Sequence, residues 1–331
     1  MTSRRRFLAG IGAGALLAAR GAHAANFHYR LGLSQPLDSP NYIRLKEMAE
    51  RVAADTGGAM QIDVHGASAL GSDNQMIAMV RKGELELYMA GNVWGPLVPV
   101  TEMPGLPFTF KTPQEVFAAL DSDLGDYIRS EMLAKGIHQF HLNFDNGFHQ
   151  LTTRTRRIRT VDDLAGMPIR TPFQKMTVDF FESLGAQPKT FTLNQLYKVL
   201  KEQLVDGQTD PYQIIVLLKL YEVQTYLNIT NHWWSGFTLN ANLEKWKALP
   251  PDIQAVVTRH ADAAALAQRA DVAKIDAGAL EVLRAKGMIV TETDTSGFRR
   301  QLGPFYERWS KVYGPRAWAL LEARVGKLIP A

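Results

Sequence analysis

The sequence predicts an α/β protein of two lobes, with one long helix packed across both lobes. Strand patterns and helix patterns alternate along residues 28–90, and they alternate again from residue 167 to a helix after Pro211 without any sequence repeat. Such alternation is typical of an open α/β sheet. The residues from Pro251 to Lys286 have the composition of a single helix that would reach ~50 Å, longer than one small domain.

The first 24 residues predict an export signal rather than part of the fold. A basic segment, Ser3–Leu8, precedes an apolar run, Ile11–Ala19, and a small-residue segment that ends at Ala24. This order is that of a cleaved signal, and the Ser-Arg-Arg-x-Phe-Leu core at residues 3–8 resembles a twin-arginine signal, which exports folded proteins. We expect cleavage near Ala24 and a periplasmic mature protein.

The composition excludes several classes of protein. The signal holds four arginines and no acid, so it accounts for the whole formal net charge of +4, and the basic pI is no sign of a nucleic-acid partner. The chain has no cysteine, which excludes disulfides, a thiolate nucleophile and a lipidated cysteine. We see no other apolar run of the ~18 residues that a membrane span needs.

The first α/β unit follows the signal. Residues 28–33 alternate as a strand, residues 42–53 repeat at helical spacing and stop at two glycines, and the pattern continues through residue 90. The expected strands are 28–33, 60–64 and 85–90, and the expected helices are 42–53 and 73–82. Ligands of open α/β sheets bind beyond the carboxyl ends of the strands, which points to Ser34 and to the loop that holds Asn92 and Trp94.

The second α/β unit is reached through an irregular Pro/Phe segment at residues 104–110. We expect helices at 113–120, 122–135, 174–184, 194–201 and after Pro211, and strands at 137–144, 167–170, 204–208 and 235–240. The long helix follows, and Gly278 leaves open whether it is straight or kinked.

The sequence contains no motif of catalysis or of metal binding in the sequence context that such a motif requires. The glycines at residues 10–14 lie in the signal and follow no strand, so they are no dinucleotide loop. His138 and His141 are three residues apart on an expected strand, which places them on opposite faces. No nucleophile elbow, zinc-protease motif or phosphate loop is present. The sequence therefore predicts no catalytic residue, no metal, no cofactor and no enzyme.

Arg170 is the strongest candidate for a binding residue. It follows the apolar Met167–Ile169, so its guanidinium is expected to be partly buried, and a buried arginine needs an anionic partner. That partner is either a ligand or an acid of the chain. Asp210 lies in a Gly/Pro-rich turn, and Trp234 adds an aromatic candidate, although adjacent Trp233 and Trp234 face opposite ways on a strand.

The order of motifs resembles that of the extracytoplasmic solute-binding proteins of tripartite ATP-independent periplasmic (TRAP) transporters, the DctP-type family. The resemblance covers nearly all of the mature chain. It rests on RLGLSQPLDSPN, SALGSDNQMIAMVRKGELEL, LPFTF, NGF followed by LTT, VDDLAG, IRTP, VDGQ with its later proline, and YEVQ.

The resemblance implies two lobes that close on a ligand, with the long helix behind both. It predicts lobe I from residues 25–147 and about 236–275, and lobe II from residues 148–235 and about 276–331. It also implies that Arg170 pairs with the ligand carboxylate. Ligand-lining positions are occupied here by Ser34, the loop of Asn92, His149, Leu193 and Asp210.

Two positions depart from the pattern of the family. His149 stands where a second arginine is common, and Asp210 stands where an asparagine is common. An ionised Asp210 repels a carboxylate and accepts from an N–H or O–H group. The expected ligand is therefore a small monocarboxylate with a donor, such as pyroglutamate or a hydroxy acid. His149 supplies either a neutral hydrogen bond or a titrating charge.

The resemblance further implies separate TRAP membrane subunits as partners, since no other span is expected in the chain. Two other functions remain open: a ligand-binding partner of a periplasmic sensor, and a periplasmic enzyme. The oligomeric state, monomer or dimer, is also open.

Overall fold

The computed structural model describes residues 27–91 and 93–329, so the expected export signal and Asn92 lie outside the described residues. The strands are β1 (Phe27–Leu33), β2 (Met60–His65), β3 (Leu87–Ala90), β4 (Ile137–Gln139), β5 (Phe144–Thr153), β6 (Pro168–Thr171), β7 (Gln187–Thr190), β8 (Gly207–Pro211), β9 (Tyr226–Ile229), β10 (Trp234–Asn242) and β11 (Ile289–Glu292). The α-helices are α1 (Pro40–Asp55), α2 (Asp73–Lys82), α3 (Pro113–Leu120), α4 (Asp123–Leu133), α5 (Lys175–Ser183), α6 (Leu196–Lys201), α7 (Tyr212–Leu217), α8 (Leu243–Lys247), α9 (Pro251–Ala285), α10 (Ser296–Gln301), α11 (Gly303–Tyr313) and α12 (Pro315–Val325).

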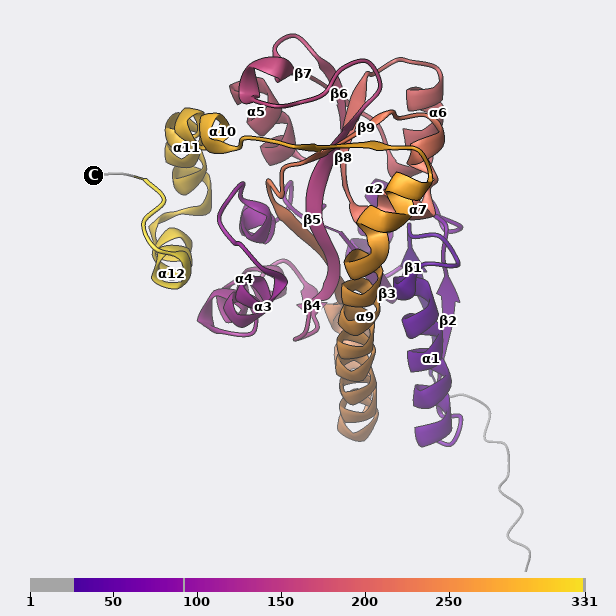
Figure 1. The fold of residues 1–331 in the computed structure, drawn as a ribbon. Coiled ribbons are helices and arrows are strands. Elements are labelled where there is room, and N and C mark those ends of the chain that lie inside the picture. The colour runs from indigo at the N-terminus through magenta and orange to yellow at the C-terminus, as the bar shows by residue number, and fades with distance from the viewer. Residues whose placement is uncertain (1–26, 92, 330–331) are drawn as a thin grey trace, which may run out of the picture.

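The strands pair in the order β2-β1-β3-β10-β5-β8-β6-β7, with β4 beside β10, and β9 joining β11 to β5. In lobe I, β1 is parallel to β2 and β3, while β10 returns antiparallel to β3. In lobe II, β6 is parallel to β7 and β8, while β5 is antiparallel to β8. Two α/β lobes are therefore joined through β5 and β10, as Figure 1 shows.

Local sequence explains the elements that build lobe I. Ser39 caps α1 by accepting from the backbone N–H of Tyr42, and Pro40 occupies the first turn, where no intrahelical donor is lost. Leu45, Met48 and Val52 recur at three and four residues and are buried against the sheet. The fixed start and the apolar face of α1 hold β1 and β2 in place.

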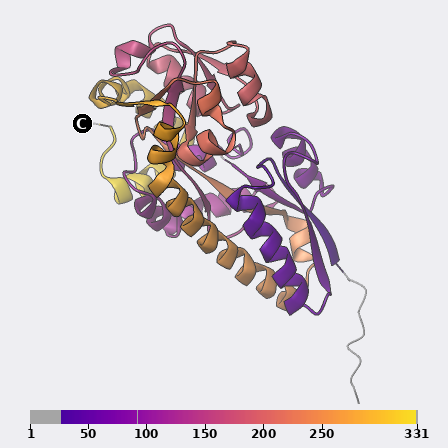
Figure 2. The same ribbon diagram turned by 45° about the vertical axis from the view of Figure 1, so that its right-hand side comes forward.

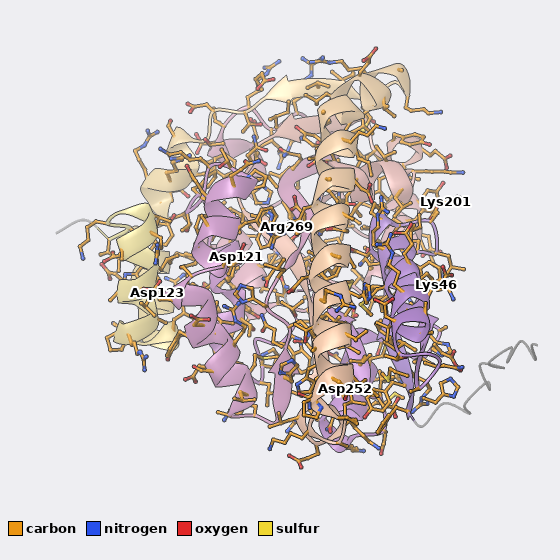
Figure 3. All side chains as sticks on the ribbon, turned by 90° about the horizontal axis from the view of Figure 1, so that it is seen from below. Lys46, Asp121, Asp123, Lys201, Asp252 and Arg269 are labelled. Atoms are coloured by element: carbon orange, nitrogen blue, oxygen red, sulfur yellow. The ribbon has the colours of Figure 1, made fainter. Side chains whose placement is uncertain are left out.

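The long helix is confirmed as one element. It runs unbroken from Pro251 to Ala285 and passes through Gly278 without interruption. It contacts α1 in lobe I, then β5, then α7 in lobe II, and Figures 1 and 2 show it running along both lobes. Midway along it, Arg269 donates from Nε to the Asn143 carbonyl at 2.7 Å, and its Nη1 lies 3.5 Å from Asp121 Oδ2 (Figure 3).

Three segments cross between the lobes at one level. Gly147 in β5 lies opposite Ser235 in β10, where the register shifts. Gly147 has φ 103°, which L-residues rarely adopt, and a Cβ there would lie 3.0 Å from Asp276 Oδ2 on α9. The lobe boundaries stay a prediction, which this convergence supports. At the C-terminus, α11 contacts α5 and α12 contacts α4, so these helices touch both lobes.

Several predicted elements are wrong in extent. The expected strand at 137–144 is two strands, β4 and β5, and β8 begins at Gly207 rather than at residue 204. Three strands were not predicted, β7, β9 and β11. The sequence of β7, QPKT, holds a proline and no apolar alternation, because it is an edge strand with partly exposed side chains.

None of the helices within residues 27–91 and 93–329 combines the length and the apolar character that a membrane span requires.

Candidate functional site

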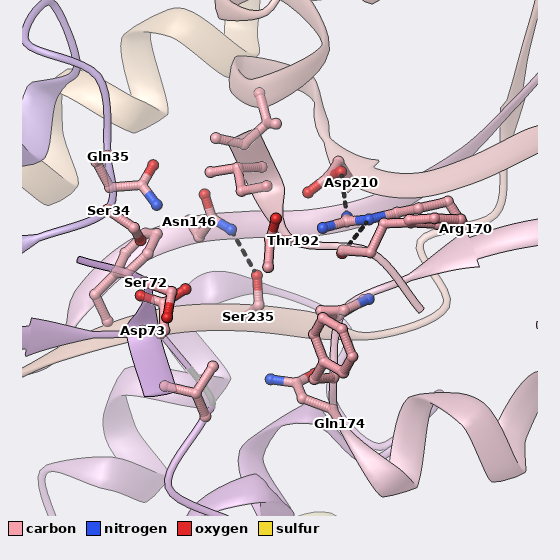
Figure 4. A pocket seen from close by; sticks show the side chains of 18 of the residues that line it. Ser34, Gln35, Ser72, Asp73, Asn146, Arg170, Gln174, Thr192, Asp210 and Ser235 are labelled. Atoms are coloured by element: carbon pink, nitrogen blue, oxygen red, sulfur yellow. Dashed lines mark hydrogen bonds and ion pairs between the residues drawn. The ribbon is translucent and has the colours of Figure 1, made fainter. Parts of the chain in front are cut away.

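A cavity of about 150 Å³ lies between the two lobes. An engineered apolar cavity of ~150 Å³ in another protein holds benzene, so this space suits a small organic molecule. Figure 4 shows Arg170 and Asp210 at one end, with Asn146 and Ser235 in the middle. The side chains at the other end come from lobe I, namely Ser34, Gln35, Ser72 and Asp73.

Arg170 is held in the wall of lobe II by its own strand. It occupies β6 between β7 and β8, and its side chain is 3% exposed. Its Nε donates to the Phe191 carbonyl at 3.0 Å, and its Nη1 lies 3.3 Å from Asp210 Oδ2. The internal acid that the sequence left open is therefore present, yet both residues also line the cavity. The guanidinium of Arg170 can therefore pair with Asp210 and with a ligand at the same time.

Burial governs the charge of this pair. Desolvation raises the pKa of Asp210 to about 7, although the neighbouring Arg170 lowers it. Desolvation also lowers the pKa of Arg170, which Asp210 and Asp73 oppose. Near neutral pH the Asp210 carboxyl is therefore poised to gain or lose a proton when a charged ligand arrives.

His149 lies in β5, beside Arg170, and lines the cavity. Its Nδ1 is 2.9 Å from Thr209 Oγ1, and its Nε2 is 2.7 Å from Ser235 Oγ. Burial lowers the pKa of His149 well below its usual value, and His232 and Arg170 lower it further, while the Thr209 backbone opposes this shift. The ring is neutral at neutral pH, so it offers hydrogen bonds and no charge.

Asp73 is a cavity residue that the sequence reasoning missed. It begins α2 directly after the cap Ser72, and its Oδ1 accepts from the Tyr88 hydroxyl at 2.6 Å. The sequence showed the helix start but assigned no function to it. A usable signal existed, because α2 follows β2 and its first turn meets the carboxyl edge of the sheet, where ligands bind.

The structure brings five of the predicted side chains to the cavity and leaves two outside. Ser34, His149, Arg170, Leu193 and Asp210 line it.

The two candidate tryptophans lie in the core and do not line this cavity. Trp94 is 2% exposed and makes an edge contact with Tyr88. Trp234 donates from Nε1 to Asp145 Oδ1 at 2.7 Å and packs edge-on against Phe117. Apolar contacts hold both rings in the core, and the indole N–H of Trp234 is satisfied by Asp145, whereas that of Trp94 is buried without a partner among the described residues.

Side chains that could hold a metal do not gather in the described part of the chain, where no group of three or more histidines and acids comes together. His138 instead stacks on Trp246 with ring centroids 4.4 Å apart.

Two α/β lobes joined by crossing strands, with a cavity between them and a buried arginine in one wall, are the architecture of a ligand-binding protein. The sequence model described as "Bacterial extracellular solute-binding protein, family 7" (DctP) matches residues 31–312. The chain belongs to this family of TRAP-type periplasmic solute-binding proteins.

Curated relatives agree with this membership. The chain is 32% identical over 304 residues to the protein y4mM of Sinorhizobium fredii, covering 90% of this chain and 56% of y4mM, so it spans little more than half of that relative. It is 27% identical over 276 residues to the 2,3-diketo-L-gulonate-binding periplasmic protein YiaO of Escherichia coli, covering 83% of this chain and 84% of YiaO.

Solved structures of TRAP periplasmic solute-binding proteins share the fold. One from Polaromonas sp. JS666, bound to D-erythronate, has a TM-score of 0.85 and 28% identity, covering 90% of this chain and 98% of that chain. One from Roseobacter denitrificans, with bound β-D-glucuronate, has a TM-score of 0.86 and 26% identity, covering 90% and 99%.

Proposed function

We propose that this chain captures a small hydroxy monocarboxylate outside the cytoplasm and delivers it to separate TRAP membrane subunits. The observation that carries the proposal is the buried Arg170 in the cavity wall. A guanidinium binds a carboxylate through two parallel N–H donors, which makes the contact strong and directional. The neighbours that hold D-erythronate and β-D-glucuronate support a hydroxy acid as the ligand.

The charges of the cavity favour one carboxylate rather than two. Asp73 faces the cavity from lobe I, and Asp210 faces it from lobe II, against the single guanidinium of Arg170. A dicarboxylate would place its second negative charge toward Asp73, where like charges repel. A hydroxyl group would instead donate to Asp73. The ligand therefore lies with its carboxylate at Arg170 and its hydroxyls toward lobe I.

Asp210 adapts to that carboxylate by protonation. Its pKa is already raised to about 7 by burial, and a ligand carboxylate on the same guanidinium raises it further. The protonated carboxyl then donates a hydrogen bond instead of repelling the ligand. The ligand's donors are consequently needed at Asp73, not at Asp210.

Delivery follows from contacts to both lobes. A ligand that touches Arg170 in lobe II and Asp73 in lobe I stabilises the closed arrangement, since the open arrangement offers only one of the two. The closed form is then the species that the membrane subunits recognise.

A panel of acids tests the proposed ligand class. The mature protein is titrated by calorimetry and by thermal unfolding with D-erythronate, D-glucuronate, L-gulonate, pyroglutamate and succinate. A ligand at about 100-fold its Kd stabilises by ~2.7 kcal/mol, which thermal unfolding detects. We expect hydroxy monocarboxylates to bind more tightly than succinate. Tighter binding of succinate, or binding of none of these acids, contradicts the proposed class.

Deletion of the gene tests the transport role separately. Loss of uptake of the acid that binds most tightly supports delivery to a transporter. Unchanged uptake together with a lost transcriptional response indicates a sensor partner instead.

A further inference from the structure

Six polar side chains form one continuous hydrogen-bonded chain from the cavity into the core. Asn146 and Ser235 line the cavity, and the far end lies among buried aromatic rings, where His232 stacks on Phe180. The successive contacts are Asn146 Nδ2 to Ser235 Oγ at 2.8 Å, Ser235 Oγ to His149 Nε2 at 2.7 Å, His149 Nδ1 to Thr209 Oγ1 at 2.9 Å, Thr209 Oγ1 to His232 Nε2 at 2.9 Å, and His232 Nδ1 to Thr230 Oγ1 at 2.6 Å.

The cavity end of this chain has a fixed direction. Gln213 Nε2 lies 2.8 Å from the backbone carbonyl of Asn146, and a carbonyl only accepts, so this atom of Gln213 is a nitrogen that donates. The same nitrogen lies 3.0 Å from Asn146 Oδ1, which must therefore be the amide oxygen. The other amide atom of Asn146 is then the nitrogen, and it donates to Ser235 Oγ.

Each of the two imidazoles donates a hydrogen bond from one ring nitrogen and accepts one at the other. Burial lowers the pKa of His232 to about 3 and that of His149 well below its usual value, so both rings are neutral. A neutral imidazole has one N–H donor and one acceptor nitrogen. The two rings cannot both donate to Thr209, because Thr209 is 0% exposed and its hydroxyl hydrogen would then have no acceptor, so the chain runs in one of two directions. In one direction, each hydroxyl and each ring donates to the neighbour that is nearer to Ser235. In the other direction, each donates to the neighbour that is nearer to Thr230.

The buried end at Thr230 decides between the two directions. Thr230 is 4% exposed, and within the described part of the chain its hydroxyl makes a hydrogen bond with His232 Nδ1 alone. If the chain ran toward Thr230, the Thr230 hydroxyl hydrogen would be buried without an acceptor, which is unfavourable. If the chain runs toward Ser235, Thr230 donates to His232 and every buried hydroxyl is satisfied.

The direction toward Ser235 leaves that serine with one unused group. Its oxygen accepts from Asn146 Nδ2 and from His149 Nε2, so its hydroxyl hydrogen points away from both and into the cavity. We propose that Ser235 is a specificity-determining donor that the His149–Thr209–His232–Thr230 chain orients toward the ligand. The ligand atom that meets it is an oxygen acceptor of a carboxylate or carbonyl group, and a ligand ammonium is excluded there. This inference rests on the proposed function, because it describes the same cavity.

The tautomers of the two histidines give a direct test. The mature protein, labelled with ¹⁵N at histidine, is measured by long-range ¹⁵N–¹H correlation without added acid, and His149→Gln and His232→Gln spectra assign the rings. We expect both rings to carry their proton on Nε2 and none on Nδ1. A proton on Nδ1 of either ring in the unsubstituted protein overturns the proposal. This readout does not depend on which acid binds.

A matched pair of substitutions at the buried end tests whether Thr230 sets the direction. Thr230→Val keeps the shape and removes the hydroxyl, so we expect a mixture of Nδ1–H and Nε2–H signals at His232. Thr230→Ser restores the hydroxyl and should restore the single tautomer. Unchanged tautomers in Thr230→Val would show that another group sets the direction.

Binding completes the test. With the acid of the panel that binds most tightly, Ser235→Ala should weaken binding about tenfold, and Thr230→Val should weaken it severalfold while Thr230→Ser does not. Native affinity in Ser235→Ala overturns the donor role. If no acid of the panel binds, the proposed ligand class fails, while the tautomers still decide the direction of the chain.

Discussion

The two walls of the cavity are built differently. In lobe II, Arg170, Asp210 and His149 project from strands, are 3–6% exposed, and are held by hydrogen bonds within the protein. In lobe I, Ser34 and Asp73 lie at the end of a strand and at the start of a helix, and they are only half-buried. This difference supports the proposal that lobe II is prearranged to bind the carboxylate and that lobe I selects the remainder of the ligand.

The largest expected loss of ligand affinity follows from a substitution in the wall of lobe II. Arg170→Ala removes the guanidinium, and loss of one partner of a buried ion pair costs roughly 3–5 kcal/mol, which corresponds to at least about a hundredfold loss of affinity. Calorimetric titration with the best acid of the panel measures it. Arg259→Ala is the control, because Arg259 is exposed and pairs with Asp55 away from the cavity. Near-native affinity in Arg170→Ala would remove this residue from the site.

A substitution in lobe I should have a smaller and more selective effect. Asp73→Asn keeps the size of the side chain and removes its charge, and hydrogen bonds to charged groups contribute about 1.5–3 kcal/mol. We expect hydroxy acids to lose about tenfold in affinity, while succinate loses less or gains. Asp63→Asn, an exposed carboxylate of β2, is the matched control. An equal loss for every acid would mean that lobe I does not select the ligand.

The affinity for the ligand should depend on pH through Asp210, which lies in the wall of lobe II. The pKa of Asp210 is about 7 without ligand, and a bound carboxylate raises it, so binding takes up a proton. The affinity is then full below pH 7 and falls as the pH rises toward the higher pKa of the complex. We expect a loss of up to about tenfold between pH 6 and pH 8, abolished by Asp210→Asn. An affinity that rises with pH would show an ionised Asp210 that accepts from the ligand.

The smallest effect is expected at the rim of lobe I. Ser34→Ala removes one neutral hydroxyl, and a neutral hydrogen bond contributes about 0.5–1.5 kcal/mol. The affinity should fall severalfold at most, measured in the same titration. A loss as large as that of Arg170→Ala would show that lobe I, and not lobe II, supplies the main anchor.

Sequence alone predicted the periodic parts of the molecule well. The helix at 73–82 has a capping serine before it and a glycine after it, and the long helix has a helix-forming composition without an internal proline, so their bounds agree with α2 and nearly with α9. The edge strand β7 and the internal strand β9 lack that spacing, because their neighbours in the sheet define them rather than their own sequence.

The candidate site shows the same division. Arg170 was predicted because it follows an apolar strand segment, where a buried guanidinium needs an anionic partner. Asp73 and Ser235 were missed, since each has an ordinary local role, a first-turn acid and a strand serine. Their importance arises from side chains far away in sequence, such as His149 and Thr230, and no local pattern encodes that proximity.

The unbroken α9 has a mechanical consequence. Because its 35 residues contact both lobes, any rotation about Gly147 must bend the helix or slide it over α1. Bending of α9 is distributed over many backbone hydrogen bonds, so the helix would deform elastically. In the proposed closure, elastic energy stored in a bent α9 while the ligand holds the lobes together would be released when the ligand leaves, and it would favour reopening of the empty protein.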